Sequence, residues 1–154
     1  KEIIEFCNQK KIMVKIHNGD YLSELALSLH PQMGFHAMNI APEFGTIETR
    51  SILSWLSENN LQKFEEEFLD IAYKSKKWQK WMLANSNLTK KEKSIIAGHY
   101  ILSTNEFIDF KKKILGQINN KNDFDNFIKK NIKNSILKYL RCLNLINNSV
   151  NRIE

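Results

Sequence analysis

Two short stretches of the chain alternate between apolar and other side chains, as half-buried β-strands do. They cover residues 12–17 and 35–40, and each leads into a polar loop and then into a segment with helical spacing. Two strands that are joined through a helix usually run parallel, because the helix carries the chain back to the end where the first strand began. The pattern therefore predicts a parallel βαβ unit.

Helical spacing covers most of the remaining sequence. We expect a short helix over residues 20–29, capped by Asp20, and a helix over residues 46–58, capped by Thr46. Two capping-box patterns, at residues 89–92 and 103–106, predict two further helix starts. Asn60 and Asp123 are the expected caps of two more helices, of which the one after Asp123 is the last and longest. The chain is thus expected to be mainly helical after its first third.

Polar residues collect just after the carboxyl ends of the two expected strands. In chain order they are His17, Asn18, Asp20, Asn39 and Glu43. Open α/β sheets and (β/α) barrels bind their ligands at this edge of the sheet. The loops after the two strands are therefore the candidate ligand site.

Side-chain alternation adds Lys15 to this site. Lys15 and His17 share one face of the first strand, because successive side chains point to opposite faces. Asn39 joins them if the corresponding faces of the two strands coincide. A helix start at Thr46 would direct backbone N–H groups of residues 45–47 at the same site, as in many phosphate sites.

Carboxylates at this edge favour a ligand that carries hydroxyl groups as well as phosphate. Glu43 and Glu48 oppose an uncompensated anion, whereas Lys15 and Arg50 attract one. A sugar phosphate satisfies both conditions. His17 with Asp20 or Glu43 can serve as a general acid/base pair for proton transfer beside a ketose carbonyl. The same residues can equally be loop caps and hydrogen-bonded strand ends.

Three segments of the chain resemble one protein family. HNGDY at residues 17–21, GFHA at residues 34–37 and NIAPEFG at residues 39–45 look like the late barrel segment of the class II D-tagatose-bisphosphate aldolase non-catalytic subunit family. Some members of that family were formerly labelled tagatose-6-phosphate kinases. Residues 68–82 and 95–100 are similar to its helical tail.

The resemblance implies a (β/α)₈ TIM barrel that acts on phosphorylated ketoses or supports an enzyme that does. The family pattern His-x-x-Asp-Tyr falls on His17, Asp20 and Tyr21, whereas residues 39–42 depart from the Lys-Val-Gly-Pro of many relatives. A (β/α)₈ barrel needs roughly 200 residues or more, and this chain has 154. We therefore expect the C-terminal βα units of a barrel over residues 1–58 and a helical C-terminal extension over residues 59–154.

The candidate roles follow from the site and the resemblance together. The candidate catalytic residues are His17, Asp20 and Glu43. The side chains expected to bind a phosphorylated ketose are Lys15, Asn18, Tyr21, Asn39, Glu48 and Arg50. No metal or other cofactor is expected, because the histidines and Glu43 show no compact ligand spacing and the resembling family lacks the zinc-dependent catalysis of class II aldolases.

Composition narrows the class of protein. With 42% hydrophobic and 26% charged residues, the chain resembles an ordinary globular domain without a membrane-spanning run. The thiols Cys7 and Cys142 lack metal-type spacing and suggest a cytoplasmic protein. The net charge of +6 comes mostly from lysine, whereas phosphate and base recognition favours arginine, so the composition favours a solvated basic surface over nucleic-acid binding. Trp78 and Trp81 are expected to pack against the core, since they are three residues apart.

These observations favour an accessory, non-catalytic subunit that stabilises a class II tagatose- or ketose-bisphosphate aldolase in carbohydrate metabolism. Its partners would be a phosphorylated ketose and either the catalytic aldolase subunit or further copies of itself, with no membrane involved. One alternative is a sugar-phosphate aldolase or isomerase in its own right. Another is a basic helical module that binds protein or nucleic acid, which a steep salt dependence would reveal.

Overall fold

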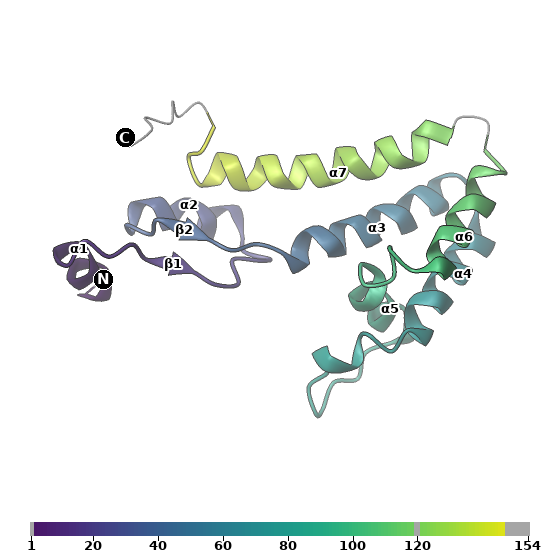
Figure 1. The fold of residues 1–154 in the computed structure, drawn as a ribbon, viewed down its shortest axis with the longest axis horizontal. Helices are drawn as coiled ribbons and strands as arrows, with labels where there is room; N and C mark the ends of the chain where they lie inside the picture. The colour runs from purple at the N-terminus through teal and green to yellow at the C-terminus, as the bar shows by residue number, and fades with distance from the viewer. Residues whose placement is uncertain (1, 119–120, 147–154) are drawn as a thin grey trace. The chain divides into compact units, whose positions relative to one another are not determined.

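The computed structural model describes residues 2–118 and 121–146, which are mostly helical (Figure 1). Contacts within the chain divide it into two compact units. The first unit comprises Lys1–Phe44 and Lys133–Glu154, and the second comprises Gly45–Ile132. Two helices, α3 (Pro42–Glu58) and α7 (Lys121–Cys142), contribute residues to both units.

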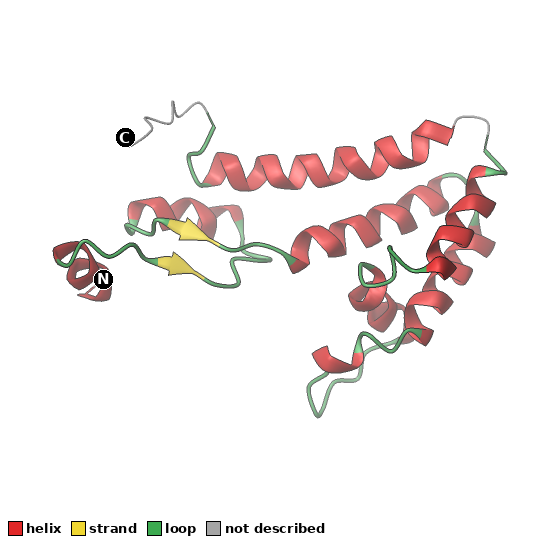
Figure 2. Ribbon diagram, viewed as in Figure 1, coloured by secondary structure: helices red, strands yellow, loops and turns green. Residues whose placement is uncertain are grey.

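The first unit contains the predicted βαβ arrangement. Its remaining elements are α1 (Glu2–Gln9), β1 (Lys15–Ile16), α2 (Glu24–Gln32) and β2 (Ala37–Met38). The two strands run parallel, as Figure 2 shows, with Lys15 opposite Ala37 and Ile16 opposite Met38. The prediction of a parallel pair is therefore confirmed, although each strand has only two residues instead of the six expected from each alternating stretch.

The prediction of a (β/α)₈ barrel segment is wrong. The described residues contain seven α-helices and only these two short strands, and every element after β2 is helical. Neighbouring polar groups shorten the pairing, because the backbone N–H of Val14 donates to the Nδ1 atom of His36 at 3.1 Å. Barrel closure needs a continuous ladder of long strands, which this arrangement does not provide.

The second unit is a helical domain with a closed apolar core. Its other helices are α4 (Gln62–Lys74), the short 3₁₀ helix η1 (Gln79–Trp81), α5 (Lys90–Gly98) and α6 (Asn105–Leu115). Phe68 and Phe110 are fully buried, and their ring centroids lie 5.7 Å apart. The ring of Trp55 meets the ring of Phe124 edge-on at 5.0 Å. Aromatic pairs of this kind add to the stabilisation that burial provides.

Local capping signals predicted some helix starts and misplaced others. The capping box at Thr89 is confirmed, because its side chain and that of Glu92 bond each other's backbone N–H. The neighbouring helix is capped by Thr104, one residue later than expected, and α2 is capped by Ser23 instead of Asp20. Where two side chains that can cap a helix lie within a few residues of each other, the sequence does not decide which of them is the cap.

The prediction that both tryptophans pack against the core is right for one of them. Trp78 stacks on Tyr73 and donates its indole N–H to the Tyr73 carbonyl at 2.9 Å. Trp81 remains 51% exposed, because η1 is too short to bring both rings onto one helical face. In the described residues, no helix is both long enough and apolar enough to cross a membrane.

Candidate functional site

The loops that follow β1 and β2 meet in the first unit, as parallel strands require. The backbone N–H of Gly19, in the first loop, donates to the carbonyl of Asn39 at 2.9 Å. Gly19 is buried against Met38, and a Cβ atom at this position would collide with the Met38 side chain. The close approach of the two loops therefore depends on glycine here.

Asp20 is one of the predicted site residues, and it caps α3 from the opposite loop. Its Oδ1 atom accepts the backbone N–H groups of Ala41 at 3.0 Å and of Glu43 at 2.9 Å. The helix begins at Pro42, a residue that suits a first helical position because it has no N–H to satisfy. A carboxylate thus occupies the start of the helix.

This arrangement corrects two expectations. The helix starts before Thr46, so Thr46 is not its cap and the N–H groups of Thr46 and Ile47 lie inside the helix. The negative charge of Asp20 already satisfies N–H groups at the true helix start. A phosphate would have to displace that carboxylate, because two anions at one helix start repel each other.

Glu43 lies at the centre of the meeting point. The residue is 6% exposed. Its carboxylate accepts hydrogen bonds from the backbone N–H of Tyr21, from the hydroxyl of Tyr139 and from Lys138 Nζ, which is 2.8 Å away. A buried carboxylate with this many donors is a stable structural group, since its lost hydration is replaced by hydrogen bonds and an opposite charge.

The surroundings of Glu43 and Tyr139 shift the pKa values of these two groups in opposite directions. Burial alone would raise the pKa of Glu43, but the hydrogen bonds from Lys138, Tyr139 and the Tyr21 backbone, with the Lys138 charge, lower it below its ordinary value. Burial, the hydrogen bond to Glu43 and the charges of Glu43 and Asp20 raise the pKa of Tyr139. Glu43 is therefore ionised and Tyr139 neutral at physiological pH.

Other predicted site residues remain at the surface of the first unit. Lys15, His17, Asn18, Tyr21 and Asn39 are exposed. Because Lys15 lies opposite Ala37, His17 and Asn39 follow on the same side of the strand pair. Within the described part of the chain, His17 forms no hydrogen bond with Asp20 or Glu43, so the expected acid/base pair is not assembled.

Glu48 and Arg50 belong to the second unit. Glu48 is half-buried, and burial raises its pKa although the charge of Lys111 opposes the shift. Arg50 is exposed. The residues that the structure describes include no group of three or more His, Cys, Asp and Glu side chains placed to hold a metal ion.

Sequence reasoning missed Lys138 and Tyr139. Both lie in the last third of α7 and therefore almost one hundred residues from the loops that they contact. Tyr139 is the only tyrosine of α7, and its hydroxyl needs a partner when it is buried. The need of a buried hydroxyl for a partner could have marked Tyr139 as a site residue, but it does not identify the partner.

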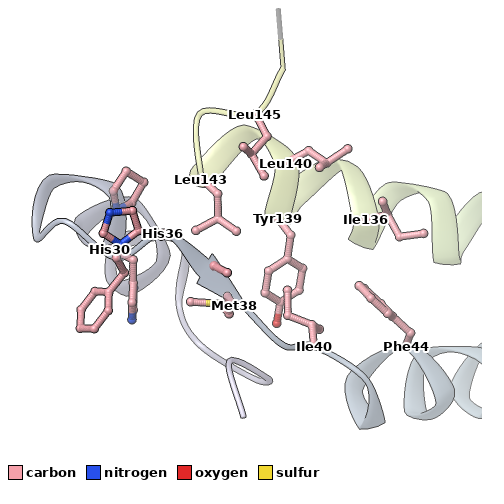
Figure 3. A pocket seen from close by; sticks show the side chains of 13 residues that line it. His30, His36, Met38, Ile40, Phe44, Ile136, Tyr139, Leu140, Leu143 and Leu145 are labelled. Atoms are coloured by element: carbon pink, nitrogen blue, oxygen red, sulfur yellow. The ribbon is translucent and has the colours of Figure 1, made fainter. Parts of the chain in front are cut away.

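The first unit also contains an apolar pocket, shown in Figure 3, with a volume of about 280 Å³. It is lined by side chains of α2, β2 and α7, among them Met38 and Leu140, and by residues just outside these elements, among them Phe35 and Leu143. His30 and His36 supply its polar edge. Their Nδ1 atoms already bond backbone groups, at 2.6 Å to the Ala26 carbonyl and at 3.1 Å to the Val14 N–H respectively. No pattern in the sequence indicates this pocket.

Comparison of the chain with protein-family models, with curated proteins and with solved structures finds no match. A function must therefore be argued from the residues and their geometry.

Proposed function

We propose that this chain is a non-catalytic accessory subunit in ketose-phosphate metabolism, which stabilises a class II tagatose- or ketose-bisphosphate aldolase. The proposed metabolic class rests on the resemblance that residues 17–21 and 39–45 bear to the accessory-subunit family. One observation carries the non-catalytic assignment: the carboxylate of Glu43 is buried and bonded to three donors, from Tyr21, Lys138 and Tyr139.

A general base needs a lone pair that can reach the substrate and a pKa near the working pH. Glu43 has neither property, because it is buried and its pKa is lowered. Asp20 holds two backbone N–H groups at the start of α3. Both candidate catalytic carboxylates, Asp20 and Glu43, thus hold the loops in place.

Ligand binding without catalysis remains compatible with this edge of the sheet. Lys15 and His17 offer an ammonium and an imidazole to a phosphate, and Asn39 offers an amide to hydroxyl groups. All three are exposed on the same side of the strand pair. We propose that this surface binds the phosphorylated ketose.

Aldol cleavage of tagatose bisphosphate separates a subunit from an enzyme. The assay compares the chain alone, a class II aldolase catalytic subunit alone and the mixture. We expect no cleavage by the chain alone and a longer active lifetime of the catalytic subunit in the mixture. Cleavage by the chain alone that His17→Ala abolishes would support the enzyme alternative and contradict the proposal.

Calorimetric titration with tagatose bisphosphate tests the binding surface. We expect Lys15→Gln to weaken binding about tenfold, the loss of one charge-assisted contact of roughly 1.5 kcal/mol. Lys63→Gln, a change of an exposed lysine in the second unit, is the matched control and should leave binding unchanged. Equal losses in both variants, or similar binding of any polyanion with a steep salt dependence, would favour the basic-module alternative.

A further inference from the structure

One edge of the strand pair has no partner strand in the described residues. The carbonyls of Val14 and Ile16 accept the N–H groups of His36 at 3.0 Å and of Asn39 at 2.9 Å, so the polar groups of these residues face β2. Backbone groups of successive strand residues point in opposite directions. The N–H and C=O groups of Met13 and Lys15 therefore point away from β2, along the open edge.

The side chains along this edge are unusually apolar for a protein surface. Ile12 is 53% exposed and Met13 is 75% exposed. Proteins usually protect an edge strand with charged side chains, proline, a bulge or a covering element, since an open apolar edge is a template for another strand. Lys15 is the only charged residue of this edge segment. The segment IMVKI at residues 12–16 has no proline or glycine and consists mainly of residues that favour strands.

We propose that β1 pairs antiparallel with β1 of a second copy of this chain, about a two-fold axis at Val14. The pairing extends the segment beyond the two residues that now form the strand and joins two parallel pairs into one four-stranded sheet. An isolated pair of strands is marginally stable, and three or more strands are much more stable. The inference is independent of the proposed function.

Hydrogen-bond direction and charge select this register. With the axis at Val14, Met13 lies opposite Lys15 of the second copy, and these are the residues whose backbone groups point outward. Ile12 then lies opposite Ile16 of the second copy, which forms two apolar cross-strand pairs. An axis at Lys15 would also satisfy the hydrogen bonds, but it would place two ammonium groups directly opposite each other.

The same edge and the same side chains are used by both copies, which is the requirement for a closed two-fold dimer. A different partner would need its own matching apolar strand. Self-pairing needs only residues 12–16, which meet the conditions of direction, apolarity and charge by themselves. This self-complementarity favours a second copy over another protein.

Cysteine cross-linking of the full chain tests the register. In a background with Cys7→Ser and Cys142→Ser, Val14→Cys should form a disulfide between copies under mild oxidation. Residues opposite each other in a non-hydrogen-bonded pair lie about 4.5 Å apart between Cα atoms, and disulfides span about 4.4 to 6.8 Å. The matched control is Leu83→Cys, at a position that is 81% exposed in the second unit, and it should remain uncross-linked.

Molar mass in solution tests the pairing without any cross-link. Light scattering should give twice the chain mass for the native sequence and half of that value for Lys15→Pro. Proline at this position removes an outward N–H and leaves the bonds to β2 intact, and circular dichroism should show unchanged helix content. A monomeric native chain, or a dimer in which Leu83→Cys cross-links better than Val14→Cys, would overturn the proposal.

Discussion

The two units of the chain are stabilised in different ways. The second unit buries a continuous cluster of apolar side chains that includes Trp55, Phe68 and Phe110. In the first unit, the buried side chains are few, and the best-connected of them is the carboxylate of Glu43. Within the described residues, every exposed large hydrophobic side chain belongs to the first unit except Trp81, Leu83 and Ile108.

This difference shows that a segment can form an amphipathic helix without contributing to a closed apolar core. Both units contain helices with apolar residues at regular spacing, but only the second arranges residues of five helices, α3 to α7, so that these apolar side chains face one another. The first unit instead relies on specific hydrogen bonds between its loops and α7. Apolar truncation should therefore affect the second unit most, and polar truncation the first.

The largest effect is expected for Phe68→Ala in the second unit. Phe68 is fully buried between the rings of Phe107 and Phe110. Removing its ring should lower the free energy of unfolding by about 3 to 5 kcal/mol, measured by urea denaturation followed through tryptophan fluorescence. Leu25→Ala, at a position that is 73% exposed in the first unit, should change it by no more than about 0.5 kcal/mol. Equal losses of unfolding free energy in the two variants would contradict the difference between the units.

The second effect in size is expected for Glu43→Ala. The change removes the carboxylate partner of Lys138 and leaves the Tyr139 hydroxyl with only the Gly19 carbonyl as an acceptor. It should cost about 3 kcal/mol, the lower limit for a broken buried ion pair. The cost is at this limit because Lys138 keeps some contact with water. Hydrogen exchange should show faster exchange at residues 19–21 while the amides of α4 and α6 stay protected. Uniform loss of protection would mean that the units do not differ.

Acid should weaken the same cluster selectively. The folded-state pKa of Glu43 lies below its ordinary value of 4.5, so its ionised form stabilises the fold at neutral pH. That contribution is complete above the unfolded pKa and is lost as the pH falls through the folded pKa. The protection of the amides at residues 19–21, expressed relative to the intrinsic exchange rate at each pH, should therefore fall in acid for the native chain, and Glu43→Ala should remove this component of the pH dependence.

A smaller effect is expected for Gly98→Ala in the second unit. A Cβ atom at residue 98 would collide with the side chain of Thr49, which is completely buried. Overpacking of this kind should cost about 1 to 3 kcal/mol and should appear as a lower urea midpoint with an unchanged slope. Gly116→Ala is the control, because its nearest neighbours would be 3.4 Å away.

The smallest effects compare two helix caps. Thr89→Ala removes a cap made within four residues and should cost about 1 kcal/mol. Asp20→Ala removes acceptors for two N–H groups of another segment and should cost up to about 2 kcal/mol. Thermal unfolding of both variants provides the measurement. A smaller loss for Asp20→Ala than for Thr89→Ala would show that the link between the loops is dispensable.

Local patterns explain which parts of the fold were predictable. The alternation around Lys15 and Ala37 identified both strands and their parallel direction, and the residues at Thr89 and Glu92 identified a helix start. These features depend on neighbours in sequence. The length of the strands was not predictable from this pattern. The side chain of His36, next to β2, accepts the backbone N–H of Val14, which a longer strand pair would use for pairing.

The candidate site was only partly predictable for a related reason. The sequence correctly brought Asp20 and Glu43 to one region, but it could not reveal that Tyr139 and Lys138 fill that region. A carboxylate beside a histidine in a loop is equally suited to catalysis and to capping. Only the contacts of α7 decide between the two roles, and those contacts are remote in sequence.

The cap on α3 has a consequence for the order of folding. Because Asp20 lies 21 and 23 residues before the N–H groups that it satisfies, the first turn of α3 depends on prior closure of a loop. Contacts of this separation form late, since the entropy of closing the loop must be lost first. The carboxyl-terminal turns of α3 should therefore be structured in the transition state before its first turn is.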